Sequence, residues 1–335
     1  MSDPTGASAL SLYVPGFRAN LNLSPQQTKS RLLRAVDADL AYDTPGQFFN
    51  ADDVGTADPQ PVVARVPNSP DGFVDYTRRF GTFLPFNDGR FIDNEDLVRE
   101  LEDPTSKVMA AMLAGLGRNR DAIILGANGV GGLMGSYQTQ TNTGAYTTGP
   151  ANQNIIPSSS DFAHENETIS ATEGGDGNFG LTIGKLIETK IILDNSEIDE
   201  PEPGDHPSEY WFACTSTQLG NLLQSVPATS SFYTDVKGLI AGTLSYFMGF
   251  NFIRLPSNAQ SNPIAKTGFT RKCMAWHKRA LVYRGRPIIP EGVVKRPDKS
   301  FRWYAYYEFN HGAVRRYDGG VVEVDCSTAD QTPFT

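Results

Sequence analysis

The segment from Phe301 to Arg316, FRWYAYYEFNHGAVRR, has the alternation of side chains that is typical of a β-strand. At about 3.3 Å per residue, a strand of this length would span roughly 50 Å, whereas most strands have five or six residues. A following turn at Asp318-Gly319-Gly320 is predicted to return the chain into the strand VVEVD. The chain is therefore expected to fold into an elongated subunit. One face of the long strand is predicted to carry Phe301, Trp303, Ala305, Tyr307 and Phe309, and the other Arg302, Tyr304, Tyr306 and Glu308.

A second long element is predicted between residues 103 and 125. Asp103 and Pro104 suit the cap and the first position of a helix, and apolar residues then recur with a helical period. About 22 residues at 1.5 Å each give a rod of roughly 33 Å. Gly115 and Gly117 would weaken this helix by about 1 kcal/mol each unless another segment packs closely against them.

The glycine-rich sequence DAIILGANGVGGLMG covers the end of this helix. A dinucleotide-binding loop needs three glycines at fixed positions; Gly129 and Gly131 satisfy two of them, but Met134 occupies the third. We therefore predict no nucleotide site. Gly126 and Gly129 are instead predicted to end the helix with left-handed backbone, which glycine adopts at little cost.

The first 60 residues are predicted to be an arm that contains one short helix, 24–40. Ser24 and Pro25 suit its start, Gln27 completes a capping box, and an apolar stripe leads to Leu40. Residues 61–92 are predicted to form an extended two-stranded excursion, with turns at PNSPDG and NDGR. A hairpin of this size is marginally stable in water, so we expect it to rest on another surface.

Residues 180–268 are predicted to form a compact α/β lobe. A helix is expected over 182–193, the run YWFAC suits a buried strand, and Thr215 with Gln218 forms a capping box for the next helix. The acidic sequence DNSEIDEPEPGD is expected to be a solvated loop. Residues 136–180, rich in Gly, Ser, Thr and Asn, are predicted to be a long surface loop with weak strand character.

Composition restricts the classes of function. The net charge of −9 argues against wholesale nucleic-acid binding, because phosphate neutralisation needs clustered Lys and Arg. Cys214, Cys273 and Cys326 lack CxxC spacing and suit reduced thiols in a cytosolic protein. No signal-peptide pattern or apolar run long enough for a membrane span is found.

The motifs for chemistry are incomplete. The sequence HENET at His164 lacks the second histidine of a zinc-protease motif, and the loop at Asp194 has Asp199 where a calcium loop needs glycine. The four histidines show no recognisable spacing from a nucleophile, so we predict no catalytic, cofactor-binding or metal-binding residues. The basic stretch 271–296 holds eight Lys or Arg and one acid, Glu291. It could contact nucleic acid, but we favour an intersubunit patch.

Five segments carry a family resemblance in the right order along residues 60–326. They are DNEDLVRELEDPTSKVMAAMLAGLGRNRDAIILGA, GLTIGKLIETKIILDNSEI, FMGFNFIRL, CMAWHKRAL and RPDKSFRWYAYYEFNHGAVRR. Together they resemble the major capsid proteins of tailed double-stranded DNA bacteriophages, whose shell fold is shared with herpesvirus capsid proteins and encapsulins.

The resemblance implies an α+β fold built from four parts. These are an N-terminal arm (1–60), an extended E-loop (61–92), a peripheral domain with a spine helix at 103–125 and long C-terminal strands (93–179 and 269–335), and an α/β axial domain (180–268).

The implied function is structural rather than enzymatic, and no cofactor is implied. Hexamers and pentamers of one chain would tile an icosahedral shell around DNA that is bound without sequence specificity, with no membrane. The implied partners are a portal protein and a cement or decoration protein. Because the chain has no room for a scaffolding segment ahead of the arm, we also expect a separate scaffolding protein. The expected location is the virion, after assembly in the cytoplasm of the host bacterium.

Some relatives bond an E-loop lysine covalently to an asparagine of a neighbour. This chain has no lysine between Lys29 and Lys107, so that bond is unavailable in its E-loop. Non-covalent contacts to acidic neighbours are expected instead, or else cement proteins. The candidate intersubunit residues are Arg65, Arg78, Arg79 and Arg90. Two alternatives stay open: an encapsulin-like bacterial shell around an enzyme cargo, and an α/β enzyme that uses the acidic or the glycine-rich loop.

Overall fold

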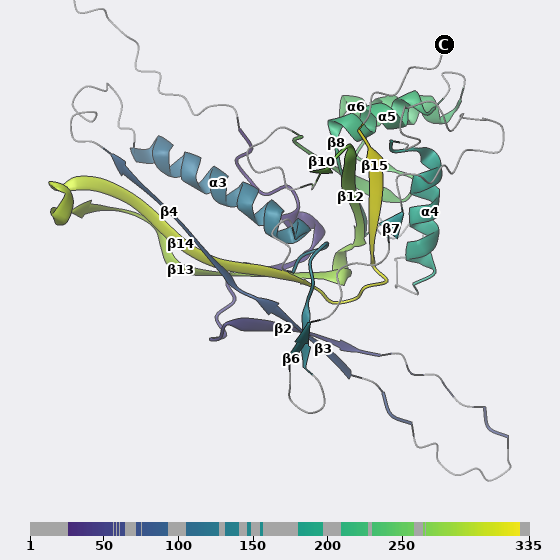
Figure 1. The fold of residues 1–335 in the computed structure, drawn as a ribbon, viewed down its shortest axis with the longest axis horizontal. Coiled ribbons are helices and arrows are strands. Elements are labelled where there is room, and N and C mark those ends of the chain that lie inside the picture. The colour runs from purple at the N-terminus through teal and green to yellow at the C-terminus, as the bar shows by residue number, and fades with distance from the viewer. Residues whose placement is uncertain are drawn as a thin grey trace, which may run out of the picture.

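A long, curved sheet extends through the subunit (Figure 1). The strand predicted from the alternating sequence is an inner strand of this sheet. In the computed structural model, β14 (Arg302–Arg315) begins one residue after Phe301. Its buried residues Ala305, Tyr307 and Phe309 share one face, as predicted. The strand order is β1 (Asp37–Asp39), β13 (Leu281–Arg296), β14 and β4 (Leu84–Ile92).

The structure describes most of the chain. The described residues are 26–55, 57, 59, 61–63, 72–74, 76–92, 105–126, 131–140, 146–148, 155–156, 180–196, 209–226, 230–257, 264 and 266–328. Within them the fold is α+β, as expected.

The helix α3 (Thr105–Leu125) lies along one face of the long sheet (Figure 1). Met112 and Leu116 pack against the buried face of β14, which explains the helical spacing of the apolar residues. The helix ends where the sequence predicts: Leu125 is its last residue, and Gly126 has the left-handed φ of +77°. Gly129, Asp103 and Pro104 lie outside the described residues.

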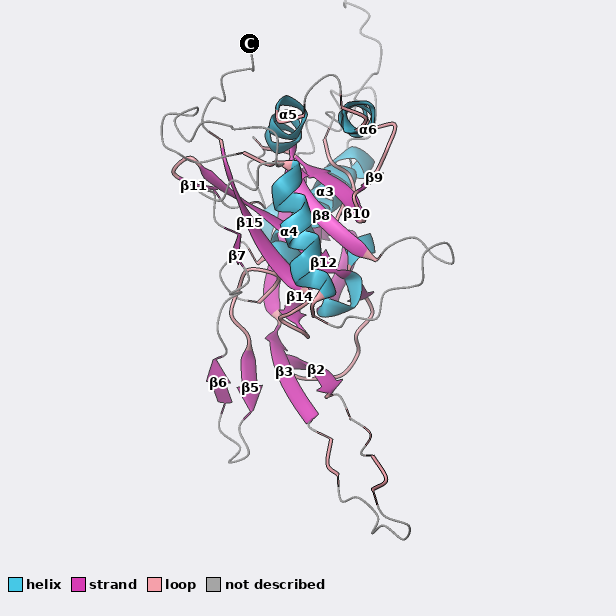
Figure 2. Ribbon diagram, turned by 90° about the vertical axis from the view of Figure 1, so that its right-hand side faces the viewer, coloured by secondary structure: helices cyan, strands magenta, loops and turns pink. Residues whose placement is uncertain are grey.

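A second sheet, covered by helices, forms a compact lobe (Figures 1 and 2), and its strands come both from residues 180–268 and from outside that range. Its strands run in the order β7 (Ile155–Ile156), β15 (Val321–Ser327), β12 (Thr270–His277), β8 (Tyr210–Thr215), β10 (Phe250–Leu255) and β9 (Tyr246–Phe247), and β11 (Lys266–Thr267) pairs with β12. Its helices are α4 (Ile183–Asp194), α5 (Ser216–Gln224) and α6 (Phe232–Ala241). A short 3-10 turn, Lys278–Ala280, connects β12 of this sheet to β13 of the long sheet, and a second one, Pro297–Lys299, connects β13 to β14.

Two local predictions in this lobe are confirmed. The helix expected over 182–193 is α4, which Thr182 caps, and Thr215 with Gln218 forms the predicted capping box of α5. The strand VVEVD, however, does not return along β14: it becomes β15 of the lobe sheet, between β12 and β7. Val321, Val322 and Val324 are fully buried, so this strand needs the interior of a sheet rather than an edge.

The third sheet contains a projecting hairpin, which extends away from the rest of the subunit (Figures 1 and 2). Its strands run in the order β2 (Phe48–Val54), β3 (Tyr76–Thr82), β5 (Gln138–Gln140) and β6 (Tyr146–Thr148). We call residues 48–82 the β2–β3 hairpin. The predicted loop 136–180 thus supplies β5, β6 and β7, and its residues 141–145, 149–154 and 157–179 lie outside the described part of the chain.

The excursion predicted at 61–92 has different strands from those expected. Its first strand is β2, which precedes residue 61, and the predicted turn NDGR lies inside β4. There Asn87 pairs with Glu308 and Gly89 with Tyr306 of β14. A Cβ atom at Gly89 would lie 2.0 Å from the Tyr304 hydroxyl oxygen. The glycine therefore makes room for a cross-strand tyrosine, and ladder pairing overrides the turn propensity.

The predicted helix 24–40 is wrong. The described residues from 26 onward form only a 3-10 turn, Leu33–Ala35, followed by the strand β1. The backbone N–H groups of Arg31 and Leu32 donate to the carboxylate of Asp121 on α3, at 3.1 Å each, instead of serving a local helix. A tertiary partner thus satisfies the backbone groups on which the helix prediction depended.

Candidate functional site at the base of the projecting hairpin

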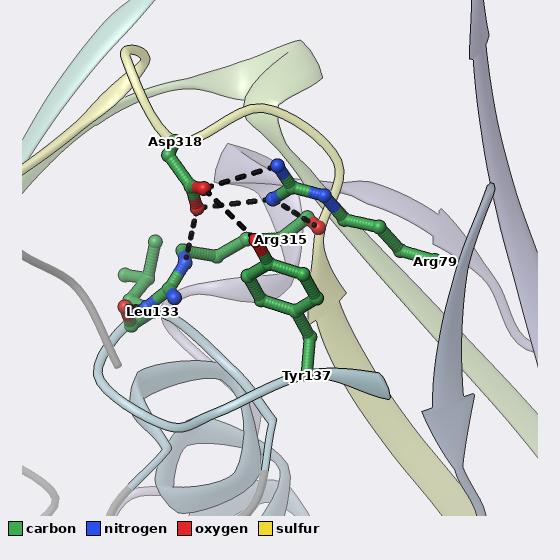
Figure 3. A network of polar contacts seen from close by, with 5 residues as sticks. All are labelled: Arg79, Leu133, Tyr137, Arg315 and Asp318. Carbon is green, nitrogen blue, oxygen red and sulfur yellow. Dashed lines mark hydrogen bonds and ion pairs between the residues drawn. The ribbon is translucent and has the colours of Figure 1, made fainter. Parts of the chain in front are cut away.

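The carboxylate of Asp318 binds the base of the β2–β3 hairpin to the rest of the subunit (Figure 3). Arg79 of β3 places Nη1 3.0 Å from Oδ1 and Nη2 3.0 Å from Oδ2. Arg315, the last residue of β14, donates from Nε to Oδ1 at 3.0 Å. The Tyr137 hydroxyl donates to Oδ2 at 3.3 Å. Side chains from three separate parts of the sequence therefore converge on a single turn residue.

The guanidinium groups are also fixed by backbone and ring contacts. Arg315 donates from Nη1 to the Leu133 carbonyl at 2.7 Å, and Arg79 donates to the Arg315 carbonyl at 3.2 Å. The Arg79 guanidinium carbon lies 4.0 Å from the centroid of the Tyr137 ring, a cation–π contact. The loop that follows α3 is thus part of the same network, because it carries Leu133 and Tyr137.

The two guanidinium groups are largely removed from solvent, whereas the side chain of Asp318 is 40% exposed. The side chain of Arg315 is 1% exposed and that of Arg79 is 14% exposed. Burial alone would raise the pKa of Asp318, but the hydrogen bonds and charges of Arg79 and Arg315 outweigh it and hold that pKa below its usual range. Burial lowers the pKa of Arg315, and Asp318 opposes this shift. The arrangement stabilises the ionised carboxylate.

Apolar packing reinforces the ionic contact. Phe49 and Phe83 form a small core with Val282 and Val314 of the long sheet. A Cβ atom at Gly312 of β14 would lie 2.3 Å from the Thr82 carbonyl oxygen, so the hairpin base and the long strand meet at backbone distance. These contacts fix the direction in which the hairpin leaves the subunit.

Beyond its base the hairpin exposes apolar side chains. Phe73 is 97% exposed and Val63 is 90% exposed, and Val54, Val62 and Tyr76 are also exposed. Single exposed apolar residues are ordinary, but a group of them on one projecting element indicates a surface that contacts another molecule. The chemistry available here is therefore contact with another macromolecule through these exposed apolar side chains.

Three of the predicted intersubunit arginines have partners within the chain. Arg78 pairs with Asp52 across the hairpin at 2.6 Å, Arg79 belongs to the Asp318 network, and Arg90 pairs with Asp88 at 3.1 Å. Arg65 lies outside the described residues. Contacts of these arginines with a neighbouring subunit stay a prediction.

The sequence did not reveal the central residue of this site. By local sequence Asp318 is a turn residue, and Arg315 and Tyr137 belong to no recognisable motif. The position of Arg315 could have indicated the site, because Arg315 ends a strand whose preceding residues are small and apolar. A cation in such a place is expected to be buried, and a buried cation needs a nearby acid.

The basic stretch 271–296 is partly neutralised by acids of the same chain. Lys272 pairs with Glu323, Arg284 with Asp37 at 3.4 Å, and Arg296 with Asp298 at 2.6 Å. Both interpretations of the stretch stay untested. Separately, the thiols predicted to be reduced are free and buried in the lobe. They belong to Cys214, Cys273 and Cys326.

Sites for metal ions or membranes are not found in the described part of the chain. No group of three His, Cys, Asp or Glu side chains there could hold a metal ion. None of the described helices is long and apolar enough to cross a membrane. His164 and Asp199, which belong to the incomplete zinc and calcium motifs, lie outside the described residues.

Solved structures of shell proteins share the whole fold. The capsid of Ralstonia phage GP4 matches with a TM-score of 0.62 and 12% identity, over 99% of this chain and 100% of that chain. The Cyanophage Pam1 capsid matches with a TM-score of 0.63 and 12% identity, over 99% and 100%. The holo-SrpI encapsulin complex from Synechococcus elongatus PCC 7942 matches with a TM-score of 0.54 and 12% identity, over 100% of both chains.

At these identities the structural matches establish the fold alone, which is the one that the resemblance implied. No curated protein matches the chain. The family model described as phage capsid protein matches residues 10–328, which is nearly the whole chain. This chain therefore belongs to the phage capsid protein family.

Proposed function

We propose that the chain is the major capsid protein of a tailed bacteriophage, and that hexamers and pentamers of it form an icosahedral head around double-stranded DNA. The observation that carries the proposal is the β2–β3 hairpin: Asp318 fixes its base, while the apolar residues beyond that base, such as Phe73, are exposed. The family membership gives the class of assembly. The hairpin supplies a physical reason for assembly.

The energetic argument concerns the apolar side chains that the subunit cannot bury by itself. Fully burying a Val, Leu or Phe side chain contributes about 1.5–3 kcal/mol. Val63, Phe73 and Tyr76 would gain this contribution if the hairpin packed on a second copy of the chain. Permanent assemblies bury apolar surface in this way, over about 2,000 Å² or more for each contact.

The remaining parts of the proposal follow from the same role. The protein acts as a structural component rather than an enzyme, and the head is assembled in the cytoplasm of the host. A separate scaffolding protein, a portal protein and a cement protein are the proposed partners. Because residues 30–106 contain no lysine, neighbouring subunits are held without an E-loop lysine cross-link. Mature particles should give a single subunit band on a denaturing gel, whereas covalent ladders would contradict this part.

The proposal is tested by expressing the chain with its neighbouring genes and imaging the product by negative-stain electron microscopy. Closed shells are expected. A variant carrying Val63→Ser, Phe73→Ser and Tyr76→Ser should keep the thermal midpoint of the parent subunit but lose the shells, because these side chains are exposed before assembly. Ile191→Ser, at an exposed site on α4, is the control. Small oligomers under all conditions would contradict the proposal.

An encapsulin-like shell is the second candidate, favoured by the match to the SrpI encapsulin complex. The two candidates differ in what the shell encloses. Particles purified after nuclease treatment should contain protected DNA if the chain forms a phage head, and a protein cargo without DNA if it forms an encapsulin. Genes for a terminase and a portal next to this one would also exclude the encapsulin.

A further inference from the structure

A basic groove runs between the segment 26–34 and the strand β10, and its lining shares no residue with the Asp318 network. Its volume is about 580 Å³. Four cationic residues line it: Lys29, Arg31, Arg34 and Arg254. All four are exposed, and no acidic residue belongs to the described lining. For a chain with a net charge of −9, this is a marked local excess of positive charge.

The cations have no acidic partner among the described residues, unlike most of the arginines discussed above. Arg31 donates from Nη1 to the Arg254 carbonyl, and Arg254 donates from Nη2 to the carbonyls of Leu239 and Ile240 at the end of α6. The guanidinium of Arg34 lies 5.3 Å from the centroid of the Trp211 ring. These contacts position three guanidinium groups without neutralising them by a carboxylate.

The carboxylate of Asp121 lies near this segment but does not belong to the groove lining. It is 1% exposed and accepts hydrogen bonds from the side chains of Gln27 and Ser30 and from the amides of Arg31 and Leu32. Its role is to fix the path of the segment that carries Lys29, Arg31 and Arg34. The main chain that carries these cations therefore has a fixed path along the groove.

We propose that this groove binds the phosphodiester backbone of the enclosed double-stranded DNA, without reading its sequence. The proposal rests on the proposed function, because DNA is the polyanion inside a phage head. A guanidinium has five N–H donors, so each arginine keeps donors for phosphate oxygens beyond the contacts described. Gln26 and Thr28 of the lining, whose side chains do not bind Asp121, are also of the kind that contacts phosphates.

An acidic protein segment is the competing partner, and the lining disfavours it. A peptide that docks stably generally adds apolar contacts to its charges. The apolar lining residues here, Phe252 and Ile253, are 7% and 2% exposed and are already packed in two hydrophobic cores of the subunit. The groove therefore offers charge and hydrogen bonds but little apolar surface, which suits a sugar–phosphate backbone.

The test measures binding of the purified, unassembled full-length chain to a fluorescent DNA duplex as the salt concentration is raised. Each phosphate contact contributes about 0.9 to the slope of log Kobs against log salt. The variant Lys29→Gln, Arg31→Gln, Arg34→Gln should therefore lower the magnitude of the slope by roughly 2.7 between about 50 and 200 mM salt. An unchanged slope and affinity would overturn the proposal.

The control variant removes the same charge elsewhere: Lys237→Gln, Lys266→Gln, Lys299→Gln, at three exposed lysines. It should keep most of the parent slope, and an equal loss would overturn the proposal in favour of a diffuse charge effect. Because Arg31 holds the Arg254 carbonyl, Lys29→Gln with Arg34→Gln is made as well. This double variant leaves the hydrogen bond intact and should lower the slope by roughly 1.8.

Two further measurements distinguish DNA from an acidic protein as the partner, and the groove proposal from the proposed function. If the groove variants weaken binding of poly-glutamate but not of DNA, the partner is an acidic protein and the proposal is wrong. In assembled particles, amine labelling of Lys29 relative to Lys299 should be lower in DNA-filled than in empty shells. If shells form normally and the relative labelling of Lys29 is the same in filled and empty shells, the groove proposal alone is contradicted. A failure to form shells would count against the proposed function.

Discussion

Arg79 on β3 and Asp318 in the turn after β14 form a two-point ion pair, with both nitrogen–oxygen distances at 3.0 Å. The two residues are 239 positions apart in the sequence. Because Asp318 also binds Arg315, the pair connects the base of the projecting hairpin to the long sheet and to the turn that enters the lobe. One carboxylate therefore contacts strands of two sheets and lies in the turn that leads into the third.

The first prediction is that Asp318→Asn destabilises the subunit. The substitution leaves the guanidinium groups of Arg79 and Arg315 without their common negative charge. Breaking a fully buried pair costs about 3–5 kcal/mol, and because the Asp318 side chain is 40% exposed we expect a loss of about 2 kcal/mol. The midpoint of urea unfolding of the unassembled chain measures this loss.

The matched control is Asp52→Asn, which breaks the ion pair with Arg78 in the same hairpin. That pair is exposed on both sides, at 56% and 46%, so its loss should change the free energy of unfolding by at most about 1 kcal/mol. Equal effects of the two substitutions would show that the Asp318 network has no special structural role.

Asp121→Asn is predicted to release the segment 26–34 from α3. The buried carboxylate accepts hydrogen bonds from two backbone amides and two side chains, and an asparagine would present an NH₂ group to some of these donors. A buried donor left unsatisfied costs about 1–3 kcal/mol. Trypsin should then cleave after Lys29 and Arg31 faster than in the parent. Asp39→Asn, at an exposed site, should leave the cleavage rate unchanged.

The fold could be predicted from the sequence where a periodic pattern of side chains extends over many residues. The alternation that ends at Arg315 and the helical stripe up to Leu125 extend over several repeats, so tertiary context could not reverse them. Two sequence patterns of only a few residues did not predict the local structure correctly. The start of a helix at Ser24 and the turn NDGR are each a few residues long, and in both cases a distant partner supplied better hydrogen bonds.

The site was less predictable, because its residues converge from distant positions. Asp-Gly-Gly correctly indicated a turn, but nothing local shows that Asp318 would accept hydrogen bonds from Arg79. For the excursion at 61–92 the sequence supports a physical argument: an extended hairpin with little core of its own is expected to rest on another surface. Which surface it contacts depends on a second copy, and one sequence does not contain that geometry.

Two glycines of α3 are predicted to respond in opposite directions to alanine. Gly115→Ala places a Cβ atom no closer than 3.8 Å to the Arg118 side chain, so it should stabilise the helix by up to about 1 kcal/mol. Gly117→Ala places it 3.0 Å from the Ser30 amide nitrogen and 3.1 Å from the Lys29 carbonyl carbon, where the segment 26–34 crosses the helix. This contact should cancel or reverse the gain. Thermal midpoints of the two variants measure both effects. Equal stabilisation would contradict the prediction, because it would mean that the main chain at Lys29 and Ser30 shifts at no cost.

His311 is predicted to make the subunit sensitive to acid. Burial, followed by the charge of Arg120, lowers the pKa of His311 to about 3. Its ring is neutral and lies 2.9 Å from the Tyr283 hydroxyl and 3.4 Å from the Asn119 amide nitrogen. The unfolded chain binds a proton at this histidine below about pH 6.5, whereas the folded chain resists protonation until about pH 3. Stability should therefore fall as the pH decreases through this window, by up to about 1.4 kcal/mol per pH unit.

The variant His311→Gln isolates this contribution. It should be less stable than the parent at pH 8, because the packing against Phe86 and Phe309 is altered. The gap between parent and variant should narrow as the pH is lowered towards 4, since the variant has no proton to exclude at this position. Carboxylates such as Asp318 titrate in both proteins and cancel in the difference. Urea midpoints measured across this range give the gap directly, and a constant gap would refute the assignment of the acid sensitivity to His311.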